Sequence, residues 1–473
     1  MMRRLFSLRL YSLVIYCAVP FALAAVLWRG LRDRRHWQGL GERFGWGRRL
    51  NSAPSIWLHA VSLGEMSAAA PLLRALRLKY PQYPLVLTTA TLTGRARAAG
   101  LFGDGAEVRF LPYDTPGAVA RFLDRIRPCL AIIVETELWP NLFAECERRG
   151  VPLVLASARL SAKSVARYRR LGNLFRGVFS AVSLVAAQTV EDAERFIAIG
   201  AQSARTRVVG NIKFDLSPGA QAIDKGRALR VSFGAARPTW IAGSTHAGEE
   251  EQVLAAHETL RERLPDALLL LVPRHPERFE AVADLLRRRQ VRFTRRSGAG
   301  GGSNGTSGGR GGTIGGGSDT GAGTSGSEPI GAAQVVLVDT VGELESLYAS
   351  ADAAFVGGSL VPIGGHNLLE PAALGLPVLT GPHHFNGKDI ARLMLDQGAA
   401  LQVGNAQELA AALARLLADP QERRRIGAIG RHIVESNRGS VARLLELIEP
   451  WLTGPAPSPV PAAASAANPA AGC

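Results

Sequence analysis

Cysteine is scarce in this chain of 473 residues, which has only four: Cys17, Cys129, Cys146 and Cys473. They are scattered and lack the close spacing of metal ligands, so we expect reduced thiols rather than a disulfide framework or a cysteine-based metal site. The nine histidines form no i, i+4 pair beside carboxylates. We therefore expect no metal site.

Acidic residues are fewer than basic ones: the chain has 40 aspartates and glutamates and 55 lysines and arginines, which gives a net charge of +15. The excess is concentrated in one place. Residues 3–49 carry ten arginines against Asp33 and Glu42 alone, which gives +8 in this segment. That concentration favours a basic amino terminus facing anionic lipid head groups over a nucleic-acid-binding surface, and we expect no nucleic-acid partner.

No charged residue interrupts the run from Leu10 to Trp28, which is nineteen residues long. At about 1.5 Å per residue, such a helix covers roughly the hydrocarbon core of a bilayer. A cleaved signal peptide is the alternative, because residues 22–24 (Ala-Leu-Ala) resemble a cleavage site. However, the apolar run continues to Trp28 and arginines follow at once. We therefore predict that residues 1–29 form a membrane anchor.

The arginines that follow the anchor predict its orientation, because positively charged flanks stay on the cytoplasmic side. We predict a single-pass protein of the inner (cytoplasmic) membrane whose other domains lie in the cytoplasm. Pro20 leaves open an anchor that enters only one leaflet.

Beyond the anchor, apolar segments that predict strands alternate with segments that predict helices. The predicted strands of the first half are 55–59, 85–89, 108–111, 130–134, 152–156 and 183–187, and the alternation restarts at Thr239. Such alternation predicts a parallel sheet with helices on both faces. We therefore predict an α/β protein with two Rossmann-like domains, 30–216 and 217–453, that face each other across a cleft.

Glycine-rich sequence interrupts the second half at residues 297–334, where sixteen of 38 positions are glycine, interleaved with serine and threonine. No core can be built from this composition, so we predict a flexible insertion in a surface loop. Residues 454–473 are rich in proline and alanine. We predict that they form a disordered tail.

A different glycine pattern occurs within Phe355–Thr380. Gly357-Gly358 and Gly364-Gly365 lie between a predicted strand and a predicted helix, where backbone N–H groups and the helix dipole favour an anion. Asn367 can cap that helix, with Glu370 as the acid of a capping box. The alternative role of Glu370 is to hold the ribose hydroxyls of a nucleotide.

Polar residues follow the other predicted strands, at the ends where open α/β sheets place ligands. In the first half, Glu65 follows one strand, and Glu135 and Glu137 follow another. Glu65 is either an ordinary first-turn acid of a helix or a general base. In the second half, Arg274 follows a strand and can either pair with Glu277 or bind a phosphate.

Eight motifs include these residues: HAVSLGE (59–65), ETELWPN (135–141), SARLS (157–161), KFD (213–215), STHAGEE (244–250), VPRHPERF (272–279), VGE (341–343) and GGSLVPIGGHNLLE (357–370). In this order and spacing they resemble the Kdo (3-deoxy-D-manno-octulosonic acid) transferases of lipopolysaccharide synthesis. The resemblance extends from the apolar run to about Trp451. The chain departs from the family pattern at Ala247, at residues 362–363 (Pro-Ile) and in the glycine-rich insertion.

The resemblance implies a GT-B glycosyltransferase, inverting and independent of metal, that transfers Kdo from CMP-Kdo to a lipid A precursor (lipid IVA). By residue, it implies that Glu65 is the general base and that Glu135 or Glu137, together with Lys213, acts at the reacting centre. The residues that it implies for binding CMP-Kdo are Pro273, Arg274, Val341, Gly342, Glu343, Gly358, Ser359, Asn367, Leu368, Leu369 and Glu370. It implies no cofactor apart from this donor substrate.

Two other classes of protein stay open. A sugar-nucleotide epimerase-like enzyme can share the two-domain fold, but it has no need of a membrane anchor. A membrane-tethered lipid-binding protein with a degenerate site would explain the basic amino terminus, but not the carboxylates and glycine pairs at the strand ends. Release of CMP in the presence of a lipid acceptor would distinguish the three.

Overall fold

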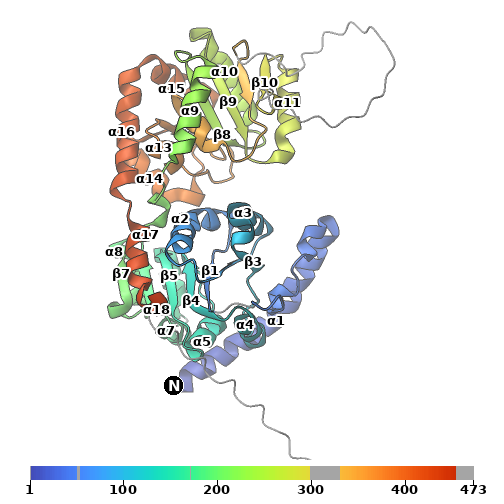
Figure 1. Cartoon of the computed structure of the whole chain (residues 1–473), viewed down its shortest axis with the longest axis vertical. Helices are drawn as coiled ribbons and strands as arrows, with labels where there is room; N and C mark the ends of the chain where they lie inside the picture. The colour runs from blue at the N-terminus through green and yellow to red at the C-terminus, as the bar shows by residue number, and fades with distance from the viewer. Residues whose placement is uncertain (1, 51–53, 171, 299–330, 454–473) are drawn as a thin grey trace, which may run out of the picture. The chain divides into compact units, whose positions relative to one another are not determined.

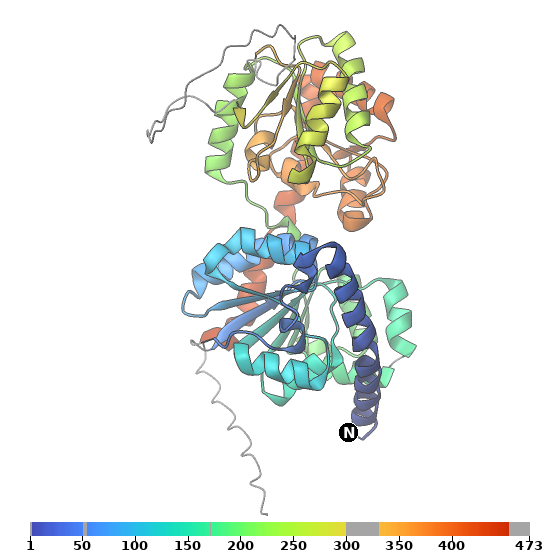
Figure 2. The same cartoon turned by 90° about the vertical axis from the view of Figure 1, so that its right-hand side faces the viewer.

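The computed structural model describes residues 2–50, 54–170, 172–298 and 331–453, which form two units (Figures 1 and 2). The first unit comprises Met1–Asp215 and Asn437–Cys473, and the second comprises Leu216–Ser436. Each unit contains one parallel sheet with helices around it. The two Rossmann-like domains expected from the sequence are therefore confirmed. Residues 299–330 of the predicted insertion and the predicted tail lie outside the described residues.

The sheet of the first unit has seven strands within the described residues, in the order β3-β2-β1-β4-β5-β6-β7. They are β1 Ser55–His59, β2 Leu85–Thr89, β3 Glu107–Phe110, β4 Pro128–Val134, β5 Leu153–Ala158, β6 Leu184–Ala187 and β7 Thr206–Val208. Every residue of β1 and β4 is buried. This follows from their nearly continuous apolar sequences, which are typical of parallel strands covered on both faces.

The helices of the first unit include a long amino-terminal helix and two short carboxy-terminal helices. They are α1 Met2–Arg32, α2 Leu63–Lys79, α3 Leu92–Phe102, α4 Pro116–Ile126, α5 Pro140–Arg148, α6 Ala162–Arg170, α7 Gly172–Ser180, α8 Val190–Ala198, α17 Ser440–Ile448 and α18 Pro450–Thr453. Helix α4 illustrates why they form: its buried positions, Ala118, Val119, Phe122, Leu123 and Ile126, lie on one face at helical spacing.

The sheet of the second unit also has seven strands within the described residues, in the order β10-β11-β9-β8-β12-β13-β14. They are β8 Thr239–Thr245, β9 Leu268–Pro273, β10 Phe293–Arg295, β11 Val335–Leu337, β12 Ala353–Val356, β13 Val378–Thr380 and β14 Ala400–Gln402. The helices are α9 Ala220–Phe233, α10 Glu250–Arg263, α11 Phe279–Arg288, α12 Leu344–Tyr348, α13 Leu369–Ala373, α14 Lys388–Asp396, α15 Ala406–Ala418 and α16 Pro420–Ser436.

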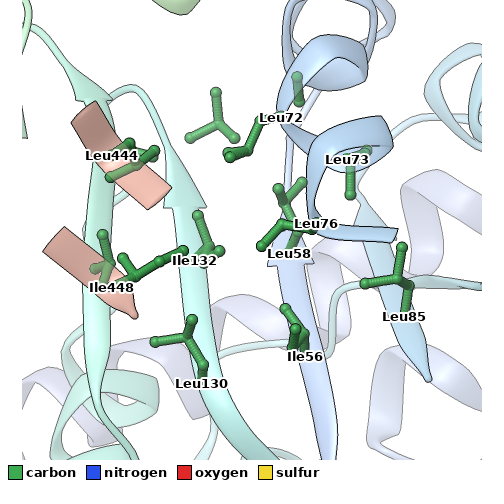
Figure 3. Packing of buried hydrophobic residues seen from close by; sticks show 14 of the residues in the cluster. Ile56, Leu58, Leu72, Leu73, Leu76, Leu85, Leu130, Ile132, Leu444 and Ile448 are labelled. Carbon is green, nitrogen blue, oxygen red and sulfur yellow. The ribbon is translucent and has the colours of Figure 1, made fainter. Parts of the chain in front are cut away.

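The carboxy-terminal helices α17 and α18 correct the predicted domain boundary, because they belong to the first unit although the sequence placed them in the second domain. Leu444 and Ile448 of α17 join the core that α2 and β4 form (Figure 3). The Asp215 carboxylate accepts hydrogen bonds from the backbone N–H groups of Gly439, at 2.6 Å, and Val441, at 2.8 Å. An apolar contact and a cap, neither visible in a linear sequence, therefore attach the chain's end to the first unit.

Helix α1 is long and apolar enough to cross a membrane, by its length and composition over Phe6–Arg32. It nevertheless contacts α5 and α7 of the first unit (Figure 2). Ser12 is buried, and its hydroxyl donates to Asn141 Oδ1 at 2.8 Å. Tyr11 makes a side-chain hydrogen bond to the buried Asp114 carboxyl. The predicted anchor is thus fastened to the first unit by polar contacts near its start.

Asp215 gives a test of the carboxy-terminal attachment. Replacing Asp215 with alanine leaves two backbone N–H groups at the start of α17 without their acceptor, a loss of about 1–2 kcal/mol for a cap. We expect the melting temperature to fall by roughly 2–8 °C, as measured by circular dichroism. Asp224→Ala is the matched control, because its ion pair with Arg227 is exposed and should contribute little. Equal shifts in the two variants would contradict the capping role.

Candidate functional site

In the sheet of the first unit, the direction in which strands are added reverses between β1 and β4, which are neighbours. Loops that leave adjacent parallel strands at such a reversal diverge and make room for a ligand. The loop after β1 leads to Glu65, and Glu135 directly follows β4. The two carboxylates that the sequence singled out are therefore placed at one end of one sheet.

Glu65 lies in the first turn of α2, which begins at Leu63. The Ser62 hydroxyl caps this helix by accepting a hydrogen bond from the Glu65 N–H at 3.4 Å. In return, Glu65 Oε2 accepts from the Val61 N–H at 2.7 Å. Glu65 therefore helps to cap α2, but this role uses only one of its two carboxylate oxygens. Among the described residues, none donates a hydrogen bond to Oε1.

Glu135 and Lys213 form an ion pair beside Glu65, with 2.7 Å between Lys213 Nζ and Glu135 Oε1. Glu135 has a φ of 60°, a backbone conformation that costs free energy for a residue with a side chain and that tends to persist at functional sites. Glu137 is half-buried, and burial together with the Glu135 charge raises the pKa of its carboxyl. Because the ion pair joins Lys213 to Glu135, Lys213 pairs with Glu135 rather than with Glu137.

Burial is the main reason that the Glu65 carboxyl binds its proton tightly. It raises the pKa of Glu65 to about 8, and the neighbouring charges of Glu135 and Glu137 act in the same direction. The Val61 N–H and the Lys213 ammonium act in the opposite direction. A carboxyl group whose pKa lies near the pH of the surrounding solution is well suited to take up and release a proton during a reaction.

The glycine loop of the second unit does not form the anion cradle that the sequence predicted. The buried Glu249 carboxylate accepts hydrogen bonds from the N–H groups of Gly358, at 2.7 Å, Ser359, at 3.0 Å, and Leu360, at 2.9 Å. The second glycine pair is also internally bonded, since the N–H groups of Gly364 and Gly365 both donate to the Gly358 carbonyl. This correction has a simple reason: the protein supplies its own anion to these amides.

The helix after the glycine loop is short. Helix α13 has five residues, Leu369–Ala373, so it provides little dipole for a bound anion. Asn367 accepts from the Leu369 N–H at 3.1 Å and donates through its side-chain amide to Glu370 at 3.2 Å. Asn367 and Glu370 therefore act together, although by a side-chain contact rather than by the backbone contact of a capping box.

Several of the residues implied for nucleotide binding have side chains that serve the core. Ser359 is fully buried, and its hydroxyl donates to the Val356 carbonyl and accepts from the Gly381 N–H. Leu368, Leu369 and Pro273 are likewise buried. These side chains hold the loop and strand ends in place. Any contact that they make with a ligand must come from their backbone.

Other implied residues are accessible. Val341 is 79% exposed, and Gly342 has a φ of 90°, which favours glycine. The Glu343 carboxylate is held by Lys225, Arg296 and Thr340.

Arg274 is half-buried at the end of β9, and its backbone N–H donates to the Thr245 carbonyl at 3.0 Å. The alternative pairing of its guanidinium with Glu277 is not found. Among the described residues, no hydrogen bond or ion pair involves this guanidinium.

Sequence reasoning missed two histidines beside Arg274. The Nε2 atoms of His246 and His366 are 2.8 Å apart, and the planes of their rings are nearly parallel. Both residues lie inside the family motifs and after predicted strands, which could have marked them as candidate site residues. Their contact could not be predicted from local spacing, because 120 residues separate them along the chain. Within the described ranges, no group of three or more His, Cys, Asp or Glu side chains is arranged to hold a metal ion.

Comparison with known proteins gives two family matches. Residues 38–216 match the family described as 3-deoxy-D-manno-octulosonic-acid transferase, and residues 330–433 match glycosyl transferases group 1. The chain is 39% identical to a 3-deoxy-D-manno-octulosonic acid transferase of Haemophilus influenzae, over 93% of this chain and 97% of that protein. It is 36% identical to the protein of the same name from Bordetella pertussis, over 93% and 99% of the two chains.

Two solved structures are similar to this chain. The UDP-GlcNAc 2-epimerase of Neisseria meningitidis matches with a TM-score of 0.51 at 12% identity, over 84% of this chain and all of that one. The C-terminal CMP-Kdo binding domain of an Acinetobacter baumannii protein matches at 30% identity, with a TM-score of 0.38, over 46% of this chain and 99% of that one. The epimerase supports the fold class alone, a GT-B-like pair of Rossmann-like domains.

Glu249 gives a test of the loop arrangement. Glu249→Ala would leave the N–H groups of Gly358, Ser359 and Leu360 without an acceptor, and each unpaired buried group costs about 1–3 kcal/mol. We expect a marked fall in melting temperature and loss of hydrogen-exchange protection at these three amides. Glu251→Ala, which changes an exposed neighbour, should leave both unchanged. Retained protection in Glu249→Ala would show that the carboxylate does not hold the loop.

Proposed function

The chain belongs to the 3-deoxy-D-manno-octulosonic acid (Kdo) transferase family, and we propose that it transfers Kdo from CMP-Kdo to a hydroxyl group of a lipid A precursor, lipid IVA. It is a glycosyltransferase of lipopolysaccharide synthesis. The observation that carries the proposed mechanism is the Glu65 carboxyl group. One of its oxygens accepts a hydrogen bond from the Val61 N–H, the other receives none from the described residues, and its pKa is raised to about 8.

Transfer with inversion is a single displacement at the anomeric carbon of Kdo. The acceptor oxygen forms the new bond while the bond to the phosphate oxygen breaks. The acceptor hydroxyl must lose its proton as its oxygen attacks, and Glu65 accepts that proton. The Val61 N–H fixes the carboxylate, so that little orientational freedom is lost in the reaction. We assign Glu135, rather than Glu137, to the reacting centre with Lys213, because Lys213 pairs with it.

We propose that the second unit binds the CMP part of the donor through Pro273 and Arg274, through residues 341–343 and through residues 367–370. Arg274 supports this because its half-buried guanidinium lacks a described partner and fits a phosphate. A CMP donor has a single phosphate, which an arginine can neutralise, so we propose that no metal is needed. Gly358 and Ser359 are assigned to support of the loop, since Glu249 and the core occupy their polar groups.

We propose that α1 attaches the enzyme to the inner membrane, where its lipid acceptor is embedded. The face of α1 that points away from the first unit exposes large apolar side chains, among them Phe6, Leu10, Leu13, Val14, Phe21, Trp28 and Leu31. These positions recur at helical spacing, as expected for a helix whose outer face contacts lipid. The arginines around α1 favour anionic head groups.

Glu65→Gln tests the base. Glutamine keeps an acceptor for the Val61 N–H but cannot take a proton at neutral pH, so we expect kcat to fall about 10²- to 10⁴-fold with the melting temperature and CMP affinity unchanged. Because the base acts only when deprotonated, wild-type kcat/KM should rise with pH and level off near pH 8. The variant should lack this rise. Glu370→Gln is the matched control, and it should weaken CMP binding instead.

If Glu65→Gln turned over as the wild type does, the base would have to be sought at Glu135 or Glu137. If neither CMP nor CMP-Kdo bound to the wild-type enzyme, the donor assignment itself would be wrong.

The anchor can be tested without disturbing its contacts with the first unit. Leu13→Asp combined with Phe21→Asp places charges on the exposed face of α1 and leaves Ser12 in place. We expect this variant to lose binding to vesicles containing anionic lipid, with its melting temperature and detergent-dispersed activity kept. Removal of residues 1–29 should release the protein as well, but should also lower the melting temperature because Asn141 and Asp114 lose partners. Undiminished vesicle binding by the double variant would contradict the anchor.

A further inference from the structure

Three histidines gather at the carboxyl ends of adjacent strands in the second unit. His246 directly follows β8, His275 follows β9, and His366 lies in the loop after β12. These strands are neighbours in the order β9-β8-β12. The planes of the His246 and His366 rings are nearly parallel, at 9°, with centroids 5.1 Å apart, and the His246 ring meets the edge of His275 at 74°. The direction of strand addition reverses here, as it does beside Glu65.

The contact between His246 and His366 is chemically specific. Their Nε2 atoms lie 2.8 Å apart, a distance that requires one nitrogen to carry a hydrogen and the other to offer a lone pair. The pair is therefore either neutral or singly protonated, because two imidazolium rings would bring two N–H groups together. It can gain one proton without breaking its hydrogen bond.

The surroundings keep this pair neutral before a ligand binds. Burial is the largest cause that lowers the pKa of His246 to about 4, and His275, Arg274 and Arg278 add to it. Burial, and then Arg274, lower the pKa of His366 to about 3.

The nearby carboxylates are engaged elsewhere. The Glu249 carboxylate receives four backbone N–H groups, from His246, Gly358, Ser359 and Leu360. The Glu250 carboxylate pairs with Arg278 at 3.0 Å. Neither therefore offers its charge to a protonated histidine.

The charges around the pair point to an anionic ligand beside it. The half-buried Arg274 guanidinium has no partner among the described residues, whereas Arg278, four residues later, is neutralised by Glu250. A Cβ at Gly358 would lie 3.2 Å from the His366 ring and 3.4 Å from the His246 ring, so both rings pack closely against this glycine. A positive charge without a partner among the described residues, beside a pair that can accept a proton, suits a phosphate.

We infer that His246 and His366 act as one unit that takes up a proton when the anionic donor binds beside Arg274 and passes it to the departing phosphate. This inference rests on the proposed function. As the bond between the anomeric carbon and the phosphate oxygen breaks, the electron pair stays on that oxygen. The oxygen takes the hydrogen from the singly protonated pair, which returns to neutral.

The protons balance over one turnover. The proton lost by the acceptor hydroxyl passes to Glu65, which releases it to water before the next turnover. The proton taken from water by the histidine pair leaves on the phosphate of CMP. That phosphate monoester has a second pKa of about 6, so it releases the proton to neutral water after it dissociates.

Calorimetry measures how many protons the enzyme takes up when it binds CMP. CMP is titrated into the full-length enzyme in detergent at pH 7.5, in two buffers with different heats of ionisation, so that the difference in heat gives the number of protons taken up. We expect the wild-type protein to take up close to one proton for each CMP bound. Nitrogen NMR of the imidazole rings should show one histidine of the pair change from neutral to protonated when CMP is added.

His366→Asn and His246→Asn test the pair, because asparagine can form a hydrogen bond but cannot carry a proton. Each should abolish proton uptake and weaken CMP binding about tenfold to a hundredfold, the loss expected for a charge-assisted hydrogen bond. Each should also lower kcat, since the departing phosphate loses its hydrogen-bond donor. His432→Asn changes an exposed histidine on α16 and should behave as the wild type.

The outcomes separate this inference from the proposed function. CMP binding without proton uptake, and with both rings neutral in the NMR spectrum, overturns the role of the pair but leaves the CMP-dependent transferase in place. Proton uptake that persists in both folded variants also overturns it, because the proton then goes elsewhere. Absence of any CMP binding by the wild-type enzyme overturns the donor assignment. Melting curves establish that each variant is folded.

Discussion

The constraint on which both units depend is the reversal in the direction of strand addition within a parallel sheet. In the first sheet it lies between β1 and β4, and in the second between β8 and β12. Because all strands in a sheet run the same way, the loops at the reversal leave from the same edge, and they diverge. Glu65 and Glu135 occupy this edge in the first unit, and His246 and His366 occupy it in the second. The chain thus places reactive groups from distant parts of its sequence together without distorting either sheet.

Carboxylates at these edges differ in function because their hydrogen-bond partners differ. Glu249 is fully buried and receives four backbone N–H groups, so both its oxygens are committed to holding the glycine loop. Glu65 receives one such group and keeps its other oxygen without a described donor, while burial holds its pKa near 8. In the first arrangement burial raises the pKa of Glu249 and the four N–H groups oppose that shift, so the carboxyl group has a structural role. The second favours a group that exchanges a proton, as Kdo transfer to a hydroxyl requires.

Both described ends of the chain belong to the first unit. Helix α1 is fastened there by Ser12 and Tyr11, and α17 by the Asp215 cap and the apolar contacts of Leu444 and Ile448. In the proposed attachment, α1 is both part of the surface of the first unit and the contact with the membrane. It fixes which face of that unit lies toward the lipid, and the proposed acceptor is itself a lipid.

The sequence alone determined the fold class, because apolar strands alternating with amphipathic helices permit few arrangements other than parallel sheets. Predicted strands 55–59 and 85–89 match β1 and β2, since each contains three consecutive apolar residues, at 56–58 and 85–87. Family motifs indicated Glu65, Arg274 and Asn367 by position. Only the tertiary structure decided the partners of each group: Glu249 on the glycine amides, Lys213 on Glu135, His366 on His246, and α17 on the first unit. Periodicity and local spacing report on contacts within a few residues, whereas these pairs are separated by between 78 and more than 200 residues, so their pairing depends on how the strands are ordered in space.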